Sequence, residues 1–330
     1  MAVIHFLNVK EGDCSVIQHY SGHVTIIDVC NAKPVTFVET LKDQALKETA
    51  KSDLGIRGNF QQKLYPVNPV IYLKDHGISS VFRFILTHPD MDHLDGIKAF
   101  FDEFNPTNLW DIDNNLEKDF EDGSPYSEDD WDFYTSLRDR EPDDNPNRLT
   151  LFSGAKGKYW NTSEDGTGGG DGLQILAPTK ALVNDARESD DYNDCSYVLL
   201  YRTDEHRILF GGDSHDKTWE HILSNHEGSV RDVDLLIAPH HGRKSGRSYA
   251  FLDVLKPKMT FFGNARSEHL AYDAWNYRGL PFITNNQAGC IMVDGKDMSV
   301  YVTHKPFAEA RNPKTFYDRA FQGFYVGYIA

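Results

Sequence analysis

An apolar run that ends in a cluster of metal-binding residue types occupies positions 81–93, reading Val81-Phe82-Arg83-Phe84-Ile85-Leu86-Thr87-His88-Pro89-Asp90-Met91-Asp92-His93. The part up to Thr87 is nearly all apolar, as is typical of a strand buried on both faces of a sheet. Residues 94–104 have their apolar positions at helical spacing, so residues 88–93 are expected on a loop between strand and helix. Two imidazoles and two carboxylates on such a loop can converge on a divalent metal ion.

Other strands are expected on both sides of this segment. Three short strands at the start of the chain, near residues 3–9, 15–18 and 23–28, form a meander, and a helix that ends at Gly77 follows them. The strand pattern resumes later, at residues 173–176, 196–201, 207–210, 233–238, 260–262 and 290–293.

The composition allows a large core and restricts the partners. The chain has 330 residues, of which 40% are hydrophobic, so it can form one large domain or two of ordinary size. The formal net charge is −16, but residues 102–145 alone hold 16 Asp and Glu against 3 Lys and Arg. The acidity belongs to this one segment, so no broad basic face for duplex nucleic acid is expected. A small anionic substrate remains compatible with this distribution.

Cysteine use and hydropathy favour a cytoplasmic protein. The four cysteines, Cys14, Cys30, Cys195 and Cys290, are far apart and form no Cys-x-x-Cys pair, which favours reduced thiols. No apolar stretch approaches the roughly 18 residues of a membrane span, and Met1 does not open a secretory signal. We therefore expect a cytoplasmic protein with no membrane partner.

Two further strand ends carry candidate ligands. Phe210-Gly211-Gly212-Asp213 closes one expected strand, and Ala238-Pro239-His240-His241-Gly242 follows another. Taken alone, Asp213 would most often be a turn residue, and Asp90 or Asp92 would cap the following helix, but the grouping of these residues with the two histidine clusters favours metal ligands. On an extended strand His240 and His241 would point to opposite faces. We therefore expect His240 to bind metal and His241 to contact the substrate or support the ligands.

Three ordered motifs resemble the metallo-β-lactamase superfamily. His88-x-Asp90-x-Asp92-His93 resembles its His-x-His-x-Asp-His signature, with an aspartate at the second ligand position, and Phe210-Gly211-Gly212-Asp213 resembles its metal-bridging Gly-Asp motif. The segment 238–245 is similar to a loop in the soluble domain of the bacterial DNA-uptake channel, the competence-type branch, and residues 193–198 resemble a strand of that branch. The resemblance runs from residue 3 to about residue 295.

The resemblance implies the αββα sandwich of that superfamily, an α/β fold in which two mixed sheets pack together with helices on the outer faces. We expect residues 1–330 to form a single domain, with an acidic inserted segment at about 97–172 and an aromatic C-terminal tail at about 305–330. The acidic segment contains interleaved aromatic residues and is expected as a helical excursion. The membrane part of the uptake channel is absent, which excludes a channel role.

The resemblance also implies a site for two divalent metal ions, Zn or Mn. The expected ligands are His88, Asp90, Asp92, His93, Asp213 and His240. The third-motif histidine of the family is missing before Ser196, and Asp194 is the candidate additional ligand among Asp191, Asn193 and Asp194. Catalytic roles are expected for Asp92, His241 and Lys244, and substrate binding for Arg243, Lys244, Ser245 and His269.

These residues predict a binuclear metal-dependent hydrolase that uses a metal-bound hydroxide. The first hypothesis is a phosphodiesterase or nuclease that acts on single-stranded nucleic acid, an oligonucleotide or a nucleotide-like molecule, because Arg243 and Lys244 offer donors to phosphate. The same centre could instead open a lactone or another carboxylic ester. A third hypothesis is a non-enzymatic interaction module with a structural metal, in which the acidic segment binds a protein partner. With Asp90 in place of a histidine, manganese should serve at least as well as zinc.

Overall fold

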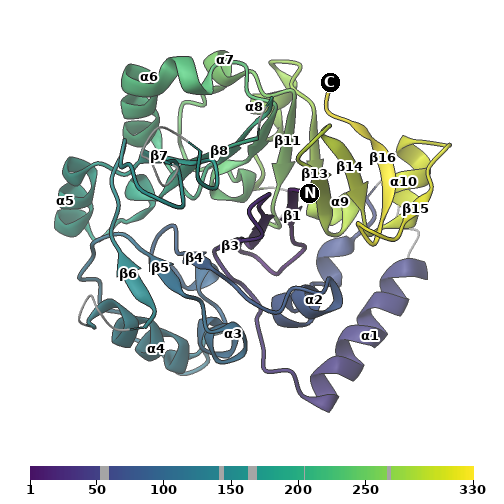
Figure 1. The fold of residues 1–330 in the computed structure, drawn as a ribbon, viewed down its shortest axis with the longest axis horizontal. Helices are drawn as coiled ribbons and strands as arrows, with labels where there is room; N and C mark the ends of the chain where they lie inside the picture. Colours follow the sequence, from purple (N-terminus) through teal and green to yellow (C-terminus); the bar gives the residue numbers. More distant parts are fainter. Residues whose placement is uncertain (53–58, 141–144, 163–168, 204, 266–268) are drawn as a thin grey trace.

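Two β-sheets packed face to face, with helices on both outer faces, make up the protein (Figure 1). The computed structural model describes residues 1–52, 59–140, 145–162, 169–203, 205–265 and 269–330. Each sheet contains both parallel and antiparallel pairs of strands. The α/β fold with two mixed sheets and outer helices, which the sequence led us to expect, is confirmed.

The first sheet has ten strands among the described residues, in the order β15-β16-β14-β13-β1-β2-β3-β4-β5-β6. They are β1 (Val3–Phe6), β2 (Ser15–Gln18), β3 (Val24–Ile27), β4 (Arg83–Ile85), β5 (Asn108–Trp110), β6 (Asn147–Leu149), β13 (Ile291–Asp294), β14 (Ser299–Val302), β15 (Tyr317–Asp318) and β16 (Gly323–Tyr328). Neighbours are antiparallel from β15 to β3 and parallel from β3 to β6. Because parallel strands need long connections, helices lie between the parallel strands in the chain.

The second sheet has six strands in the described part of the chain, in the order β12-β11-β10-β9-β8-β7. They are β7 (Leu173–Ala177), β8 (Val198–Arg202), β9 (Arg207–Phe210), β10 (Leu235–Ile237), β11 (Met259–Phe262) and β12 (Phe282–Thr284). Strands β9 to β12 are parallel, whereas β7 and β8 are antiparallel to their neighbours. The four parallel strands therefore end at one edge of the sheet.

Alternating side chains hold the layers together. Ile85 of β4 lies in one buried cluster with Leu199 and Ile237 of the second sheet, so these residues fill the space between the sheets. Phe84, the neighbour of Ile85, points to the opposite face because successive side chains alternate along a strand. There it packs against α3 (Ile97–Phe104), where its ring centroid is 5.7 Å from that of Phe100.

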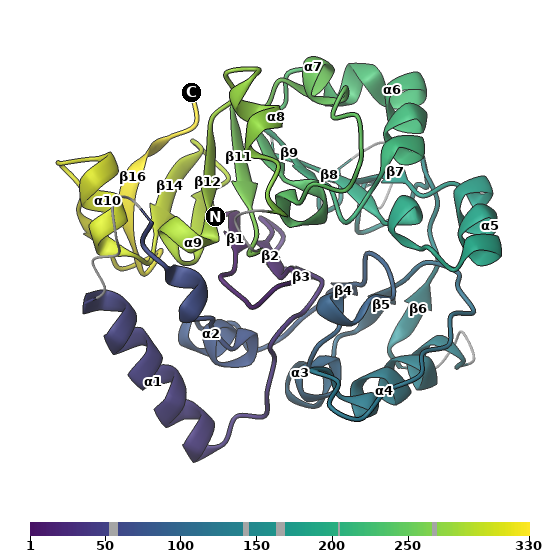
Figure 2. The same cartoon turned by 180° about the vertical axis from the view of Figure 1, so that it is seen from behind.

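Helices cover both outer faces, as the two opposite views show (Figures 1 and 2). Besides α3, they are α1 (Phe37–Ser52), α2 (Pro69–Asp75), α4 (Glu128–Arg138), α5 (Lys180–Ser189), α6 (Asp216–Val230), α7 (Leu252–Leu255), α8 (Tyr272–Asn276), α9 (Asn285–Ala288) and α10 (Lys305–Arg311). The first sheet packs under α2, α3 and α4, and the second under α6, α7 and α8. Among the described helices, none is long and apolar enough to cross a bilayer.

The acidic segment contributes strands as well as a helix. The helical excursion expected there corresponds to α4, whose Trp131 and Tyr134 are buried. Two parallel strands, β5 and β6, extend the first sheet beyond β4 and were missed because strands of three residues are too short to show alternation. The aromatic tail, for which the sequence gave no assignment, forms α10, β15 and β16. The limits of the inserted segment stay a prediction.

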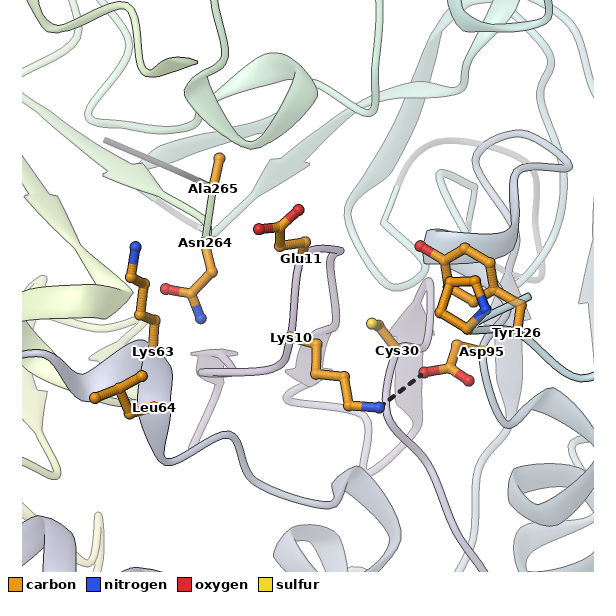
Figure 3. Close-up of a pocket in the computed structure, with 10 residues that line it drawn as sticks. Lys10, Glu11, Cys30, Lys63, Leu64, Asp95, Tyr126, Asn264 and Ala265 are labelled. Atoms are coloured by element: carbon orange, nitrogen blue, oxygen red, sulfur yellow. Dashed lines mark ion pairs between the residues drawn. The ribbon is translucent and has the colours of Figure 1, made fainter. Parts of the chain in front are cut away.

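Loops from both sheets meet at one edge of the sandwich. The loops after β3 and β4 of the first sheet lie there with the loops after β9, β10 and β11 of the second. A cavity of about 480 Å³ opens at this edge, between Cys30 after β3 and Asn264 after β11 (Figure 3). Ligand sites in α/β folds commonly lie outside the carboxyl ends of the strands, so this edge is where a functional site is expected.

Candidate metal centre

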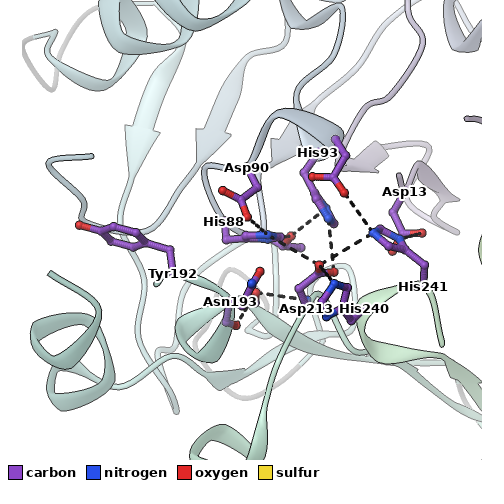
Figure 4. Close-up of polar contacts among 12 residues, drawn as sticks. Asp13, His88, Asp90, His93, Tyr192, Asn193, Asp213, His240 and His241 are labelled. Atoms are coloured by element: carbon purple, nitrogen blue, oxygen red, sulfur yellow. Dashed lines mark hydrogen bonds and ion pairs between the residues drawn. The ribbon is translucent and has the colours of Figure 1, made fainter. Parts of the chain in front are cut away.

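Loops that follow three strands bring the predicted metal-binding residues together (Figure 4). The loop after β4 carries His88, Asp90, Asp92 and His93, the loop after β9 carries Asp213, and the 3-10 turn η4 (Pro239–Gly242) after β10 carries His240 and His241. Since β4 belongs to the first sheet and β9 and β10 to the second, the candidate centre lies where the two sheets meet.

Asp213 lies in the middle of this group. Its Oδ1 atom is 3.3 Å from Nε2 of His93, and its Oδ2 atom is 3.9 Å from Nε2 of His88. The Oδ2 atom is also 3.6 Å from Nε2 of His240 and 3.8 Å from Nε2 of His241. Four imidazole nitrogens, two from each sheet, thus approach one buried carboxylate.

A glycine allows Asp213 to reach this position. Gly212 has a φ of 49°, in the left-handed region, and a Cβ atom there would lie 2.8 Å from the carbonyl oxygen of Tyr197 and 2.9 Å from Cβ of Ser196. Any other residue would therefore clash as well as adopt an unfavourable backbone conformation. The amide N–H of Asp213 donates to Oγ of Ser196 at 3.2 Å, which fixes the carboxylate at the end of β9.

Among the residues that the structure describes, three overlapping sets of side chains could hold a metal ion, because their ligand atoms lie within 4.8 Å of one another. The sets are His88, His93 and Asp213; Asp92, His93 and His241; and Asp13, Asp213 and His241. In the second set, Oδ2 of Asp92 is 3.4 Å from Nε2 of His241. The sets share members, so they form one continuous cluster that includes Asp13, a residue between β1 and β2 that is not among the ligands predicted from the sequence.

The hydrogen bonds of His93 and His88 leave their Nε2 lone pairs free. Nδ1–H of His93 donates to Oδ2 of Asp28 at 2.9 Å. Thr87 donates its hydroxyl proton to the same Asp28 carboxylate at 2.7 Å, so its oxygen accepts from Nδ1–H of His88 at 3.1 Å. A neutral imidazole that donates through Nδ1 carries its lone pair on Nε2. Both lone pairs face Asp213.

His241 also has an oxygen beside its Nδ1 atom, but as an ion-pair contact and not as a hydrogen bond. Its Nδ1 atom lies 3.0 Å from Oδ1 of Asp13, and its Nε2 atom points to Asp92 and Asp213. The Nε2 atoms of His88, His93 and His241 and the Oδ1 atom of Asp213 are all buried and have no hydrogen-bond partner among the described residues. Buried polar atoms rarely lack a partner, and three nitrogens and a carboxylate oxygen around one point suit a divalent cation. The donor set therefore fits the metal that the sequence resemblance implies.

His240 has the opposite arrangement. Its Nδ1 atom is 2.8 Å from Oγ of Ser245 and 3.2 Å from Nη2 of Arg247. A guanidinium has no acceptor, so Nδ1 of His240 accepts and the proton of the neutral ring is on Nε2. Burial, despite the opposing effect of Asp213, lowers the pKa of His240 to about 4, which keeps the ring neutral. His240 thus presents an N–H, and not a lone pair, toward Asp213.

The premise behind the predicted roles of His240 and His241 was wrong. The two histidines are not on an extended strand: their φ angles are 54° and 55°, in the left-handed region, and both side chains face the centre. Gly242 follows directly, and a Cβ atom there would lie 2.7 Å from the ring of Phe262. The turn is therefore set by close packing against β11, which the sequence does not show. His241 is the better candidate ligand of the pair.

The histidines and carboxylates of the cluster shift one another's pKa values. Burial alone would lower the pKa values of His93 and His241, but the carboxylates of Asp213 and Asp28 raise that of His93 well above its usual value. Asp13 and Asp213 raise the pKa of His241 to about 10. Against the effect of burial, the hydrogen bond from His241 lowers the pKa of Asp92 to about 2. Without a metal, protons on His93 and His241 supply the positive charge that balances the buried carboxylates. A bound cation would replace these protons.

Asp90 is the most exposed of the predicted ligands. Its Oδ2 atom is 3.5 Å from Nε2 of His88, and its Oδ1 atom is 2.9 Å from Nζ of Lys118. Although burial opposes it, His88 and Lys118 together lower the pKa of Asp90. Lys118 belongs to the acidic segment, so one of the few basic residues of that segment reaches the candidate centre. The sequence offered no signal for this contact.

Asp194, the candidate additional ligand, caps a helix in this structure. Its Oδ1 atom accepts from the backbone N–H groups of His215 and Thr218 at 3.1 Å each, at the start of α6. It belongs to none of the three ligand sets, and we leave it out of the proposed centre. Its neighbour Asn193 has a buried Oδ1 atom without a partner and lies beside His88 and Asp213 in Figure 4. Asn193 is the stronger candidate at this position.

In the basic loop after η4, some side chains support the candidate centre and others face the solvent. Ser245 holds His240, whereas the ammonium of Lys244 is exposed and 3.8 Å from Asp273. The backbone N–H groups of Arg243 and Lys244 donate to the carbonyl groups of His240 and His269, so the loop is pinned beside the centre. Arg247 is the buried cation of this loop, and its Nη1 atom donates to the carbonyl oxygen of Ser214 at 2.6 Å.

Comparisons with known proteins find similar structures but no similar sequence. No protein-family model matches the chain, and no curated protein does. Tm1679, a metal-dependent hydrolase of the β-lactamase superfamily, is 10% identical with a TM-score of 0.49, over 89% of this chain and 99% of that one. Igni18, a metallo hydrolase from the archaeon Ignicoccus hospitalis, is 10% identical with a TM-score of 0.45, over 88% and 99%. A diphosphatase from the PhnP family is 14% identical with a TM-score of 0.41, over 86% and 95%. Because these TM-scores are below 0.5, we base the proposal of function on the site itself.

Proposed function

We propose that this protein is a metal-dependent hydrolase of the metallo-β-lactamase superfamily that cleaves phosphodiesters. The observation that carries the proposal is the convergence of three buried Nε2 atoms, from His88, His93 and His241, on Asp213. Each of the three rings has its Nδ1 atom against an oxygen acceptor, which is the arrangement that orients metal-binding histidines in proteins.

The donor set divides into two halves that share Asp213. We assign Asp92, His93 and His241 to a nitrogen-rich half, and His88, Asp90 and Asn193 to an oxygen-rich half. Two divalent cations in such a centre lower the pKa of a bound water and polarise an oxygen of the substrate. Asp28 and Thr87 keep His93 and His88 in the tautomer that can bind a cation, and Asp13 lies beside Nδ1 of His241.

His240 supplies a proton donor at the same point. Its Nε2–H faces the centre, while Ser245 and Arg247 hold the other side of the ring. A donor within reach of the departing oxygen stabilises the charge that forms there as the bond breaks. This role replaces the ligand role that we expected for His240 from the sequence, and His241 takes the ligand role.

Positive side chains around the centre favour a phosphodiester over a neutral ester. Arg247 is buried behind His240, Lys118 is 2.9 Å from Asp90, and Lys244 lies on the loop beside them. A phosphodiester keeps its negative charge throughout hydrolysis, so it gains from these cations, whereas a lactone would gain little. The phosphate recognition expected from Arg243, Lys244, Ser245 and His269 stays part of this proposal.

The proposal is tested by hydrolysis assays on protein stripped of metal and reloaded with Zn or Mn. The substrates are bis-p-nitrophenyl phosphate, short oligonucleotides, a lactone and p-nitrophenyl acetate. We expect phosphodiester cleavage that is lost with chelator and restored by metal. Cleavage of the lactone alone would replace the proposal with a carboxylic ester hydrolase. Tightly bound metal without any hydrolysis would favour the interaction module with a structural metal.

A further inference from the structure

One segment of the chain passes along the candidate metal centre from its oxygen-rich half to its nitrogen-rich half. It comprises residues 113–126, between β5 and α4, and we call it the strap. Near its start, the hydroxyl of Tyr192 donates to Oδ1 of Asn115 at 3.0 Å. Tyr192 directly precedes Asn193, which lies beside His88 (Figure 4). The strap thus begins against the oxygen-rich half.

The middle and the end of the strap lie next to candidate ligands of both halves. Nζ of Lys118 is 2.9 Å from Oδ1 of Asp90, the most exposed of the predicted ligands. At the other end Tyr126 lies beside Asp95 (Figure 3), and burial together with the nearby carboxylate of Asp92 raises the pKa of the Tyr126 phenol. Since the exposed side of Asp90 adjoins the strap, a substrate that reaches the metals from solvent passes beside it.

Helix α4 fixes the strap to the ligand loop. Nη1 of the buried Arg138 donates to the carbonyl oxygen of Leu116 at 2.7 Å. At the start of α4, the buried carboxylate of Asp130 accepts from the backbone N–H groups of Gly96 and Lys98 at 2.9 and 3.1 Å. These two groups lie at the start of α3, which follows the ligand loop, so the strap and the ligand loop belong to one packed unit.

The exposed side of the strap is negatively charged. The strap contains five Asp and Glu residues and one lysine, and this lysine, Lys118, is already engaged by Asp90. Four of the carboxylates are exposed, namely those of Glu117, Asp119, Glu121 and Asp122. Exposed charges interact over about 10 Å at about 0.1 M salt, so these carboxylates act on an anion that passes the strap without touching it.

The basic loop after η4 carries the opposite charge. Its Lys244 is exposed, and its Arg247 is buried with Nη2 against the ring of His240. One phosphate at the metals is attracted by the metal ions and by this loop. A second phosphate on the side of the strap meets the exposed carboxylates and is repelled.

We propose that the strap makes the centre selective for small phosphodiesters with a single negative charge, and that it disfavours oligonucleotides because its exposed carboxylates repel their flanking phosphates. The proposal rests on the proposed function and narrows its substrate class. Selectivity of this kind comes from repulsion of the wrong ligand and needs no added contact with the right one.

Three thymidine substrates separate charge from length in assays of the metal-loaded protein. Thymidylyl-thymidine has one phosphodiester, hexathymidylate has several, and a hexamer with methylphosphonates on both sides of one phosphodiester is long but singly charged. We expect similar kcat/KM for the two singly charged substrates. Hexathymidylate should be cleaved at least roughly tenfold less efficiently per linkage at about 0.01 M salt, and this difference should shrink severalfold at about 0.15 M salt, where charges are screened.

A triple variant with Asp119→Asn, Glu121→Gln and Asp122→Asn removes three charges and keeps the side-chain shapes. It should raise kcat/KM for hexathymidylate roughly tenfold at low salt and leave that for thymidylyl-thymidine within about twofold. The control variant removes three exposed carboxylates from the outer helices α6, α7 and α10, with Glu227→Gln, Asp253→Asn and Glu309→Gln. It changes the net charge equally and should leave the cleavage of hexathymidylate unchanged.

The outcomes separate this proposal from the proposed function. Equal efficiency of the wild type on thymidylyl-thymidine and hexathymidylate, or an equal gain in the control variant, overturns the role of the strap, while cleavage of bis-p-nitrophenyl phosphate still supports the hydrolase. A methylphosphonate hexamer that is cleaved as poorly as hexathymidylate also overturns it, because length and not charge would then decide.

If no phosphodiester is hydrolysed, the proposed function fails, and the fluorescence anisotropy of labelled hexathymidylate tests the strap by itself. Binding at low salt that is at least severalfold tighter in the triple variant than in the wild type and the control variant supports the proposal. Binding that is equal in all three proteins, or absent from all three, rejects it.

Discussion

The two halves of the candidate centre, which share Asp213, are supported in different ways. In the nitrogen-rich half both imidazoles are buried, and each is backed by a carboxylate, His93 by Asp28 and His241 by Asp13. A carboxylate behind a histidine raises its basicity and fixes its orientation. This half should therefore hold a metal tightly, with little rearrangement.

The oxygen-rich half is more open and less supported. Its one imidazole, His88, is backed by the neutral hydroxyl of Thr87, and its carboxylate, Asp90, is partly exposed and held by Lys118. Asn193 lies beside His88, and its buried Oδ1 atom has no hydrogen-bond partner within the described part of the chain. The comparison teaches that one edge of a fold can offer two candidate cation sites whose ligands differ in burial and in hydrogen-bonded support.

The largest effect is expected from Asp213→Ala, because this carboxylate belongs to both halves. Loss of a shared ligand should remove metal from the whole centre and lower kcat/KM by at least roughly 10³-fold. Metal content by elemental analysis and turnover of bis-p-nitrophenyl phosphate measure it, with circular dichroism to confirm folding. Asp185→Ala, which removes an exposed carboxylate paired with Lys217, is the control. Retained turnover would show that Asp213 is not a ligand shared by two catalytic metals.

The next effect separates His241 from His240. We expect His241→Ala to lower the metal content, whereas His240→Ala should keep the metal and lower kcat by roughly 10²-fold or more, the usual contribution of a general acid. The loss in His240→Ala should be smaller for a substrate with a good leaving group such as p-nitrophenolate. His226→Ala on α6 is the matched control. If His240→Ala loses metal and His241→Ala does not, the roles are those expected from the sequence.

Removing the carboxylate behind His93 tests the support of the nitrogen-rich half. Asp28→Asn keeps the shape of the side chain but can no longer accept as a carboxylate, so metal affinity should fall roughly 10- to 100-fold. Competition with a coloured chelator measures the affinity. Thr87→Val removes the hydroxyl behind His88 and one hydrogen bond to Asp28, so it should weaken the oxygen-rich half most and the tighter site less than Asp28→Asn does. Equal weakening of both sites by both variants would contradict the division into halves.

Metal preference tests the oxygen-rich half directly. Hard oxygen ligands favour manganese, and imidazoles favour zinc, so manganese should support activity at least as well as zinc in the wild type. Asp90→His adds an imidazole and should shift the preference toward zinc severalfold. Activity recovered after stripping is compared for the two metals. A preference for zinc that Asp90→His leaves unchanged would remove Asp90 from the ligands.

The smallest effect is expected from Lys118→Ala. Its ammonium is 2.9 Å from Asp90, so the variant loses a positive charge at the open side and lets the pKa of Asp90 rise toward its usual value. KM for a phosphodiester should increase a few-fold, with weaker dependence on salt. Lys74→Ala, a lysine paired with Glu103, is the control. An unchanged KM and salt dependence would show that the acidic segment does not take part in binding.

The ligand motifs could be found from the sequence because strand ends are recognisable. Asp213 comes after a glycine pair at the end of one apolar strand, and His88 comes directly after a second apolar strand. The strand pattern therefore predicts that the two residues meet at one edge of the fold. Asp28 ends a strand in the same way and has a φ of 58°, yet nothing in the chain links it to His93, 65 residues away. Contacts between distant loops depend on how the two sheets pack, which a local pattern does not contain.

The roles of His240 and His241 could not be predicted for the same reason. The sequence suggests an extended pair, but close packing of Gly242 on Phe262 turns the chain so that both rings face the centre. The tautomer of His240 is set by Arg247, seven residues later, and no local sequence pattern links these two side chains. Three-residue strands such as β5 and β6 were likewise invisible, since neither shows an alternating pattern.

Anomalous diffraction from crystals grown with zinc or manganese tests the central claim most directly, because it locates the metals and names their ligands. We predict two peaks flanking Asp213, one bound by Nε2 of His93 and His241 with Asp92, the other near His88 and Asp90. Nε2 of His240 should bind neither. The absence of any peak at Asp213, or a peak bound by His240 and not by His241, would contradict the account.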